Sequence, residues 1–168
     1  FFARIYLRQI RRALKSPAEI LDAGCQAGRL SVPLALAGHR VTGVDTSDLA
    51  LRRARRHARE AGTELRLIRA DLGKWLPRPA AASFAAVVCT EVLYLRPNHR
   101  ELLRGLIRVL RPGGLCFISH RPSTYYLAEA AGRRDLKAAK TVLTQKEGTL
   151  FGSYYNWQER EDLERAYA

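Results

Sequence analysis

The segment Ile20–Gly28 constrains the fold of this chain more than any other. It is an apolar run, Ile-Leu-Asp-Ala, that passes directly into a glycine-containing turn, Gly-Cys-Gln-Ala-Gly. A second apolar run follows and ends in Asp45. In doubly wound sheets such a turn lets ligand atoms approach the backbone, and a carboxylate roughly 20 residues further on accepts hydrogen bonds from ribose hydroxyls. The two segments therefore predict a parallel sheet that binds a nucleoside cofactor.

Strand and helix patterns alternate between residues 19 and 119. After an amphipathic helix over residues 1–15, the apolar patterns predict strands at 19–23, 40–44, 65–70, 83–89 and 115–119, and helices at 29–37, 48–61 and 98–110. Ser47 is a favourable N-cap for the helix at 48–61. This alternation predicts parallel strands with right-handed crossovers, in an α/β three-layer Rossmann-like sandwich.

The chain departs from this alternation after residue 120. Residues 141–145 and 149–155 flank Lys146-Glu147-Gly148 and predict a β-hairpin. The same region contains the aromatic residues Tyr125, Tyr126, Tyr154, Tyr155 and Trp157. They form either a lid or acceptor pocket, or an ordinary aromatic core patch. We interpret the chain as one domain, 1–168, with an N-terminal helix at 1–15, a Rossmann-like core at 16–120 and an aromatic lid or hairpin region at 121–168.

The chain carries a formal net charge of +13, and 24 of its 29 basic residues are arginine. The basic residues recur at helical spacing, in stripes made of Arg4, Arg8, Arg11 and Lys15; Arg52, Arg55, Arg56 and Arg59; and Arg100, Arg104, Arg108 and Arg111. A nucleic-acid interface concentrates charge on one surface, whereas stripes on separate helices are typical of their solvated backs. Nucleic-acid binding is therefore open but not favoured.

The cysteine content and the hydropathy of the chain argue against a disulfide-linked, a metal-binding or a membrane-spanning protein. Cys25, Cys89 and Cys116 form no paired framework and no C-x-x-C motif, so we expect neither disulfides nor a metal site. Cys89 and Cys116 lie in apolar runs and are expected in the core. No apolar run approaches the roughly 18 residues of a membrane span, and no cleavable signal is visible. We expect a cytoplasmic protein without a membrane partner.

The spacing of the glycines indicates which cofactor the turn accepts. A nicotinamide site favours G-x-G-x-x-G, because the pyrophosphate approaches several backbone N–H groups at a helix N-terminus. Here Gly24 and Gly28 are separated by three residues, and Gln26 stands where a further glycine is expected. Asp22, two residues before Gly24, favours a ligand that carries positive charge over a pyrophosphate.

From residue 16 to residue 120, the chain resembles the class I S-adenosylmethionine-dependent methyltransferases. The likeness is carried by Asp22–Gly28, by Asp45, by Asp71-Leu72 and by the turn Leu110–Gly114. The resemblance implies that the cofactor is held by Asp22, Ala23, Gly24, Gly28, Asp45, Thr46, Asp71, Leu72 and Thr90. Asp45 would accept hydrogen bonds from both ribose hydroxyls, and Asp71 would accept one from the adenine amino group. Thr90 would face the sulfonium.

The chain also differs from the family pattern. Gln26 replaces the usual middle glycine of the first motif, and Ala85 stands where a carboxylate commonly follows Phe84. The family usually completes a seven-stranded sheet with two further strands, one of them antiparallel. This chain has no methionine and begins and ends within helical patterns, so we expect trimmed ends and a sheet that lacks the last strands.

The resemblance implies an enzyme that transfers a methyl group from S-adenosyl-L-methionine to a small-molecule acceptor by in-line displacement, leaving S-adenosyl-L-homocysteine. The protein mainly aligns the reactants, and it needs a base only for a protonated nucleophile. Candidates for the catalytic residues are Glu91, Tyr94 and His120. The alternatives are an RNA methyltransferase that uses the arginine-rich surface, a non-catalytic cofactor-binding or interaction module and, more remotely, a nicotinamide enzyme.

Overall fold

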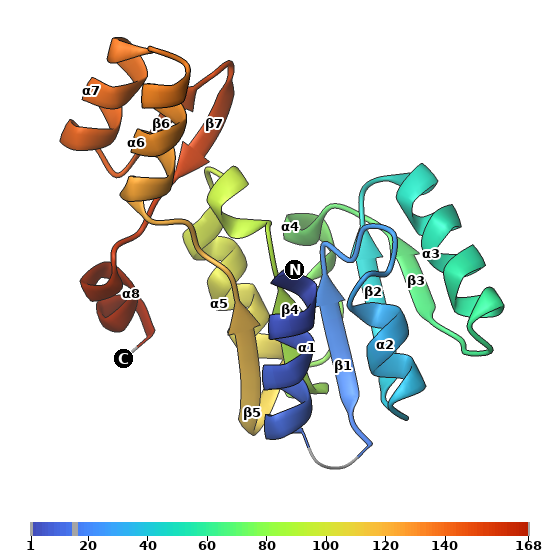
Figure 1. Ribbon diagram of the computed structural model, residues 1–168. Helices are drawn as coiled ribbons and strands as arrows, with labels where there is room; N and C mark the ends of the chain where they lie inside the picture. Colours follow the sequence, from blue (N-terminus) through green and yellow to red (C-terminus); the bar gives the residue numbers. More distant parts are fainter. Residues whose placement is uncertain (1, 15–16, 168) are drawn as a thin grey trace. The chain divides into compact units, whose positions relative to one another are not determined.

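The computed structural model in Figure 1 describes residues 2–14 and 17–167. The chain divides into two compact units. The first, which we call the sheet unit, consists of Phe1–Thr90 and Arg100–Ile118, and the second, the aromatic unit, consists of Glu91–His99 and Ser119–Ala168. Lys15, which the sequence places in the first basic stripe, lies outside the described residues.

The sheet unit is built on five parallel strands. They are β1 (Glu19–Ala23), β2 (Arg40–Asp45), β3 (Arg66–Arg69), β4 (Phe84–Cys89) and β5 (Leu110–Ile118). Their order in the sheet is β3-β2-β1-β4-β5, and each neighbouring pair is parallel. The predicted α/β Rossmann-like fold is thereby confirmed. β1 occupies the centre, which explains why its apolar run is almost completely buried.

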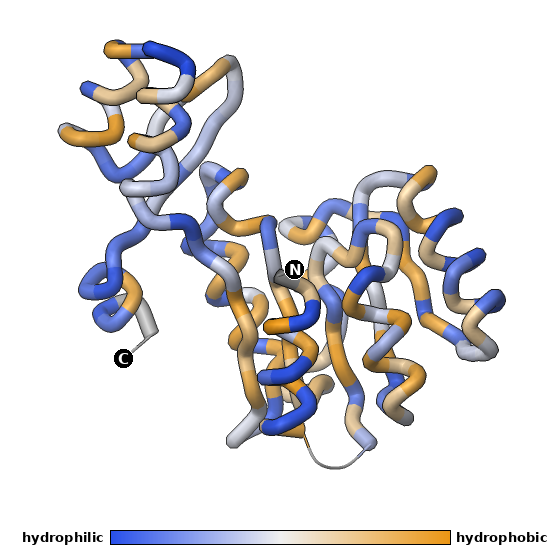
Figure 2. The backbone as a smooth tube through the Cα atoms, viewed as in Figure 1, coloured by the Kyte–Doolittle hydropathy of each residue, from blue (hydrophilic) through white to orange (hydrophobic). Residues whose placement is uncertain are grey.

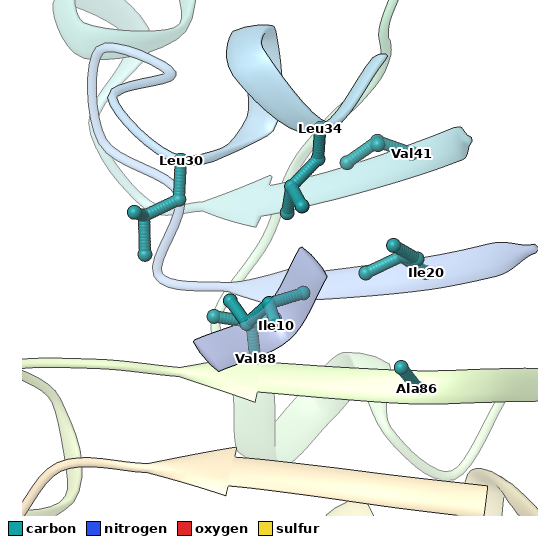
Figure 3. Packing of buried hydrophobic residues seen from close by; sticks show 7 residues of the cluster. All are labelled: Ile10, Ile20, Leu30, Leu34, Val41, Ala86 and Val88. Carbon is teal, nitrogen blue, oxygen red and sulfur yellow. The ribbon is translucent and has the colours of Figure 1, made fainter. Parts of the chain in front are cut away.

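Helices cover the sheet. They are α1 (Phe2–Ala13), α2 (Ser31–Leu36), α3 (Asp48–Glu60), α4 (Leu72–Trp75) and α5 (His99–Val109). Ile10 of α1 and Leu34 of α2 pack against Ile20, Val41 and Val88 of the strands in one buried cluster (Figure 3). Figure 1 shows α5 on the opposite face. In Figure 2 the hydrophobic colour alternates with the hydrophilic one along α1 and α3, because these helices turn their charged sides to solvent.

Local side-chain chemistry explains where the helices begin. The predicted cap at Ser47 is confirmed, since its side chain accepts a hydrogen bond from the backbone N–H of Ala50 over 3.2 Å. The preceding helix, α2, starts later than predicted, at Ser31 rather than at Arg29. Residues 24–30 are needed for the turn that follows β1, and Pro33 then falls within the first helical turn, where proline is tolerated.

The last strand of the sheet differs from the prediction. β5 begins at Leu110, which pairs with Phe84, and the ladder then resumes with Leu115 opposite Ala86. The intervening Arg-Pro-Gly-Gly segment forms an irregularity in the strand instead of preceding it. The expectation that Cys116 lies in the core is wrong, because β5 is an edge strand and leaves this thiol exposed.

The aromatic unit has its own small core. Its elements are η1 (Leu93–Leu95), α6 (Ser123–Gly132), α7 (Leu136–Thr144), β6 (Glu147–Leu150), β7 (Ser153–Asn156) and α8 (Arg160–Tyr167). Tyr126 and Trp157 are fully buried together with Ala130, Val142 and Leu150. Of the five aromatic residues named from the sequence, Tyr126 and Trp157 thus belong to a packed core, whereas Tyr125 is exposed.

The predicted hairpin exists, but at shifted positions. β6 and β7 are antiparallel, with Leu150 opposite Ser153, so the chain turns at Phe151 and Gly152 and not at residues 146–148. Both turn residues have positive φ, +53° and +81°, as a two-residue type I′ turn requires. Residues 141–144 belong to α7, whose first turn is capped by Asp135.

Among the helices that the structure describes, none combines the length and the apolar character needed to cross a bilayer.

Candidate functional site

Three carboxylates lie along one edge of the sheet. Asp22 is the penultimate residue of β1, Asp45 is the last residue of β2, and Asp71 follows β3. Thr90 comes directly after β4. Because β3, β2, β1 and β4 are parallel neighbours in that order, all four residues lie at the carboxyl edge, where open α/β sheets bind their ligands. Four of the predicted cofactor residues therefore share one edge.

The turn after β1 is held by backbone hydrogen bonds. The N–H groups of Gly24 and Cys25 both donate to the carbonyl of Val44, over 2.8 and 3.2 Å. Gln26 has a φ of +48° although it is not glycine. Gly28 has a φ of +80°, and a Cβ at this position would lie 3.2 Å from the Cβ of Ala54. Gly28 is therefore required both by its backbone conformation and by the close approach of α3.

Asp45 ties this turn to the end of β2. Its Oδ2 accepts a hydrogen bond from the N–H of Gln26 over 2.9 Å, and its Oδ1 accepts one from the N–H of Ser47 over 2.8 Å. A carboxylate offers about four acceptor positions. Asp45 can therefore hold the turn and still accept hydrogen bonds from ligand hydroxyls. Thr46, next in the chain, is exposed.

Asp22 is a buried acid. Its side chain is only 2% exposed, and Ser31 at the start of α2 donates a hydrogen bond from Oγ to Oδ2 over 2.5 Å. Burial raises the pKa of Asp22 to about 6; the hydrogen bond from Ser31 opposes this rise, and the negative charge of Asp45 adds to it. Ser31 was not predicted from the sequence, although its position at the start of the helix that follows the turn is a signal that could have identified it.

Asp71 caps a short helix. Its Oδ1 accepts a hydrogen bond from the N–H of Gly73 over 2.9 Å at the start of α4, and Leu72 beside it is buried. Asp71 therefore acts as the N-cap of α4, and the hydrogen bond from Asp71 to an adenine amino group stays a prediction.

A small cavity of about 20 Å³ lies beside the turn. Its lining consists of Asp22, Gly24, Cys25, Gln26, Arg29, Leu30 and Thr90. Burial raises the pKa of the Cys25 thiol well above its usual range, so this group stays neutral and is no nucleophile. The buried carboxyl group of Asp22 and the backbone of the turn suit a ligand group that carries positive charge. Among the residues that the structure describes, no three His, Cys, Asp or Glu side chains come together as a metal site.

The candidates Glu91 and Tyr94 belong to a polar network in the aromatic unit. Tyr94 donates its hydroxyl hydrogen to Oε2 of Glu91 over 2.6 Å, and Arg121 donates to the same oxygen over 2.7 Å. Ser119 accepts a hydrogen bond from the N–H of Glu91 over 2.7 Å and donates one to its Oε1 over 3.1 Å. The backbone of Glu91 has a φ of +63°, a conformation that these contacts hold in place.

The network determines the protonation of both candidates. Burial by itself would raise the pKa of Glu91, but the hydrogen bonds from Tyr94, Arg121 and Ser119 and the charge of Arg121 lower it below its usual value. Burial and the neighbouring Glu91 raise the pKa of Tyr94 beyond its usual range. At neutral pH Glu91 is thus an ionised acceptor and Tyr94 a neutral donor.

Arg121 is a member of this network that the sequence analysis missed. Its guanidinium lies 4.3 Å from the ring centre of Tyr94 and 4.4 Å from that of Tyr125. Neither Ser119 nor Arg121 could be linked to Glu91 from local patterns, since 28 and 30 residues separate them in the chain. His120 lies between these two residues, and burial, followed by the charge of His99, lowers its pKa to about 4. Its imidazole is therefore neutral near pH 7.

Comparison with known proteins agrees with this geometry. Residues 20–114 match the family described as "Methyltransferase domain". The chain therefore belongs to this family, as a class I S-adenosylmethionine-dependent methyltransferase domain. A ubiquinone biosynthesis O-methyltransferase from Pseudomonas putida is 35% identical over 132 residues, which make up 75% of this chain and 55% of that protein. The chain thus spans about half the length of the curated relatives it matches.

Solved structures share the fold. A SAM-dependent methyltransferase from Methanosarcina mazei superposes with a TM-score of 0.75 at 22% identity, covering 94% of this chain and 81% of that one. The magnesium protoporphyrin IX methyltransferase from Synechocystis, crystallised with bound S-adenosylhomocysteine, gives a TM-score of 0.68 at 20% identity, covering 97% and 68%. At these identities the likeness establishes the fold.

Proposed function

We propose that the carboxyl edge of the sheet unit binds S-adenosylmethionine and that the protein transfers its methyl group to a small-molecule acceptor. The observation that carries this proposal is the alignment of Asp22, Asp45 and Asp71 at the ends of three adjacent parallel strands. When bound, the cofactor supplies a methyl group on a positively charged sulfur. A row of carboxylates suits such a ligand better than it suits a pyrophosphate.

Each part of the edge has a distinct task in this proposal. Asp45 uses its remaining acceptor positions for the ribose hydroxyls. Asp71 and Leu72 hold the adenine, the acid through a hydrogen bond and the leucine against the ring. The turn backbone, from Ala23 through Gly24 to Gly28, holds the methionine portion. Thr90 faces the sulfonium, and Thr46 lies beside the ribose.

The acceptor is a small molecule, and we favour an oxygen atom on it. The support is the similarity to the O-methyltransferase of ubiquinone biosynthesis. A hydroxyl acceptor loses a proton when it is methylated, so a base accelerates the step. Among the three candidates we select His120, because its imidazole is neutral near pH 7 and can take up a proton, although a pKa of about 4 makes it a weak base. The carboxylate of Glu91 already accepts hydrogen bonds from Tyr94, Arg121 and Ser119, and the raised pKa of Tyr94 keeps its hydroxyl protonated.

Calorimetric titration with S-adenosylmethionine tests the cofactor site. Asp45→Asn removes one acceptor oxygen, and we expect it to raise the Kd by about tenfold or more, since hydrogen bonds to charged groups are worth about 1.5–3 kcal/mol. Asp48→Asn is the matched control, because Asp48 is nearby on α3 and pairs only with Arg52 in the described structure. Unchanged binding by Asp45→Asn would refute the site.

Methyl transfer is measured separately with labelled cofactor and a panel of hydroxylated aromatic compounds. We expect His120→Gln to lower the transfer rate by about 100-fold or more, in line with general base catalysis, while the cofactor Kd stays within about twofold. Cofactor binding without transfer to any acceptor would favour the non-catalytic module instead.

A further inference from the structure

A second cavity lies at the edge of the sheet opposite to the carboxylates. Its volume is about 580 Å³, and its lining includes Glu19, Thr42, Arg66, Arg78 and Arg111. Glu19 and Arg66 are the first residues of β1 and β3, and Arg111 is the second residue of β5. We call it the basal cavity. Its size falls within the range of about 300–1,000 Å³ that is usual for small-molecule sites.

The charge in the basal cavity is positive. Three exposed arginines, Arg66, Arg78 and Arg111, line it beside a single acidic residue, Glu19. Glu19 is itself paired with Arg40. In residues 2–14 and 17–167, none of the three lining arginines forms an ion pair of its own. Like charges that gather around a cavity without counter-charges favour an anionic ligand.

The hydroxyl of a largely buried threonine completes the polar wall. Thr42 in the middle of β2 is only 6% exposed, yet its side chain lines the cavity. Across the described chain its hydroxyl has no hydrogen-bond partner. The oxygen of this hydroxyl is not among the fully buried polar atoms that lack a partner, so it is accessible to water or to a ligand in the cavity.

The loop that carries Arg78 is held in place by hydrogen bonds. Arg108 of α5 donates from Nη2 to the carbonyls of Leu76 and Pro79, over 2.5 and 2.9 Å. Ser83 donates from Oγ to the carbonyl of Ala80 over 2.6 Å. These hydrogen bonds fix the loop that forms the wall of the cavity opposite the strands.

We propose that the basal cavity binds a small molecule through a phosphate group. Guanidinium forks match the geometry of phosphate oxygens and bind them in pairs. The Thr42 hydroxyl donates an additional hydrogen bond. The volume of the cavity admits a small phosphate ester or pyrophosphate, and the proposal is independent of methyl transfer at the other edge of the sheet.

Calorimetric titration of the full chain with pyrophosphate and with ribose 5-phosphate tests this site; the first probe represents a free anion and the second a phosphate ester. Removing two of the three guanidiniums in Arg66→Gln/Arg111→Gln is expected to weaken binding of the preferred probe by about tenfold or more. The matched control Arg55→Gln/Arg104→Gln loses the same charge from equally exposed positions on α3 and α5 that do not line the cavity and should bind within about twofold of the wild type.

Thr42→Val keeps the shape of the side chain and provides a test that does not depend on the folding of the double variant. We expect it to weaken binding by about threefold or more, with an unchanged circular dichroism spectrum. The proposal is overturned if the wild type binds neither probe, if both double variants lose binding equally, or if folded Thr42→Val binds like the wild type.

Discussion

At the scale of single residues, burial changes the chemistry of Asp22. Its pKa rises from 3.8 to about 6, mainly because the carboxyl group is removed from water. Between about pH 4 and pH 6 the folded state therefore binds more protons than the unfolded state, so the free energy of unfolding falls as the pH rises through this window. The difference of about two units between the pKa of Asp22 in the folded and unfolded states corresponds to about 3 kcal/mol in the free energy of unfolding.

Asp22→Asn removes this titration while it keeps the shape of the side chain. The stability of the wild type relative to this variant should be greatest near pH 4 and should decline by up to about 3 kcal/mol as the pH approaches 7. Urea unfolding of both proteins across this range gives the difference directly, with Asp48→Asn as an exposed control. A difference that stays constant with pH would contradict the burial effect.

The ion pair between Glu91 and Arg121 leads to a second prediction at the scale of single residues. Each side chain is 27% exposed, so Arg121→Gln leaves a partly buried carboxylate without its charged partner and should lower the free energy of unfolding by about 1–3 kcal/mol at pH 7. Because the pKa of Glu91 is lowered in the folded state, its contribution is present above its ordinary pKa of 4.5 and is lost as the pH falls further.

The control for this pair is Arg160→Gln, which removes an exposed ion pair with Glu164. We expect a change of about 0.5 kcal/mol or less in that variant. Equal effects of the two substitutions in urea unfolding at pH 7 would show that the network around Glu91 contributes no more than a surface contact.

At the scale of elements, the turn between β1 and α2 depends on one glycine. Gly28 has a φ of +80°, and a Cβ there would meet Ala54 and Val32 at 3.2 Å, whereas Gly38 has a φ of +89° with nothing within 4 Å. Gly38→Ala should cost about 1–2 kcal/mol from backbone strain alone. Gly28→Ala should cost about 2–4 kcal/mol, because crowding against α3 is added.

Denaturant unfolding of the two glycine variants measures this difference, and the same samples can be titrated with S-adenosylmethionine. We expect weaker cofactor binding only in Gly28→Ala, since Gly38 lies at the opposite end of α2. Similar stabilities of the two variants would mean that α3 shifts to accommodate the extra methyl group, and would contradict the predicted crowding.

At the scale of the whole molecule, the net charge of +13 raises the question of RNA as the substrate. The arginines of α1 and α3 are exposed on separate helices, so RNA should associate only through diffuse contacts. Its affinity should then fall by about 10³-fold between about 50 and 200 mM salt if some six phosphates are involved. Cofactor affinity should change by less than about twofold.

Methyl incorporation distinguishes the two classes of substrate. With labelled cofactor at about 200 mM salt, we expect no more label in added RNA than in a control without RNA. Incorporation that resists this salt concentration would identify RNA as the acceptor and would give the exposed arginines a function.

Several features of the fold were predictable because they depend on neighbours in the chain. The apolar run of β1, the cap at Ser47 and the carboxylate at the end of β2 follow from periodicity and local hydrogen bonding. The hairpin was misplaced because α7 extends to Thr144 through packing against a core that the sequence does not reveal. Arg111 was assigned to a solvated helix face, but it is the second residue of an edge strand and lines the basal cavity.

The order of amino acids alone thus specified the alternating strands, and with them the row of acids at the strand ends, since parallel neighbours bring their carboxyl ends to one edge. Three-dimensional packing added the properties that arise between distant segments. The raised pKa of Asp22, the contacts of Arg121 with Glu91 and the arginines of the basal cavity all depend on burial and on partners far away in the chain. Such interactions have no local signature, because desolvation and charge act through space.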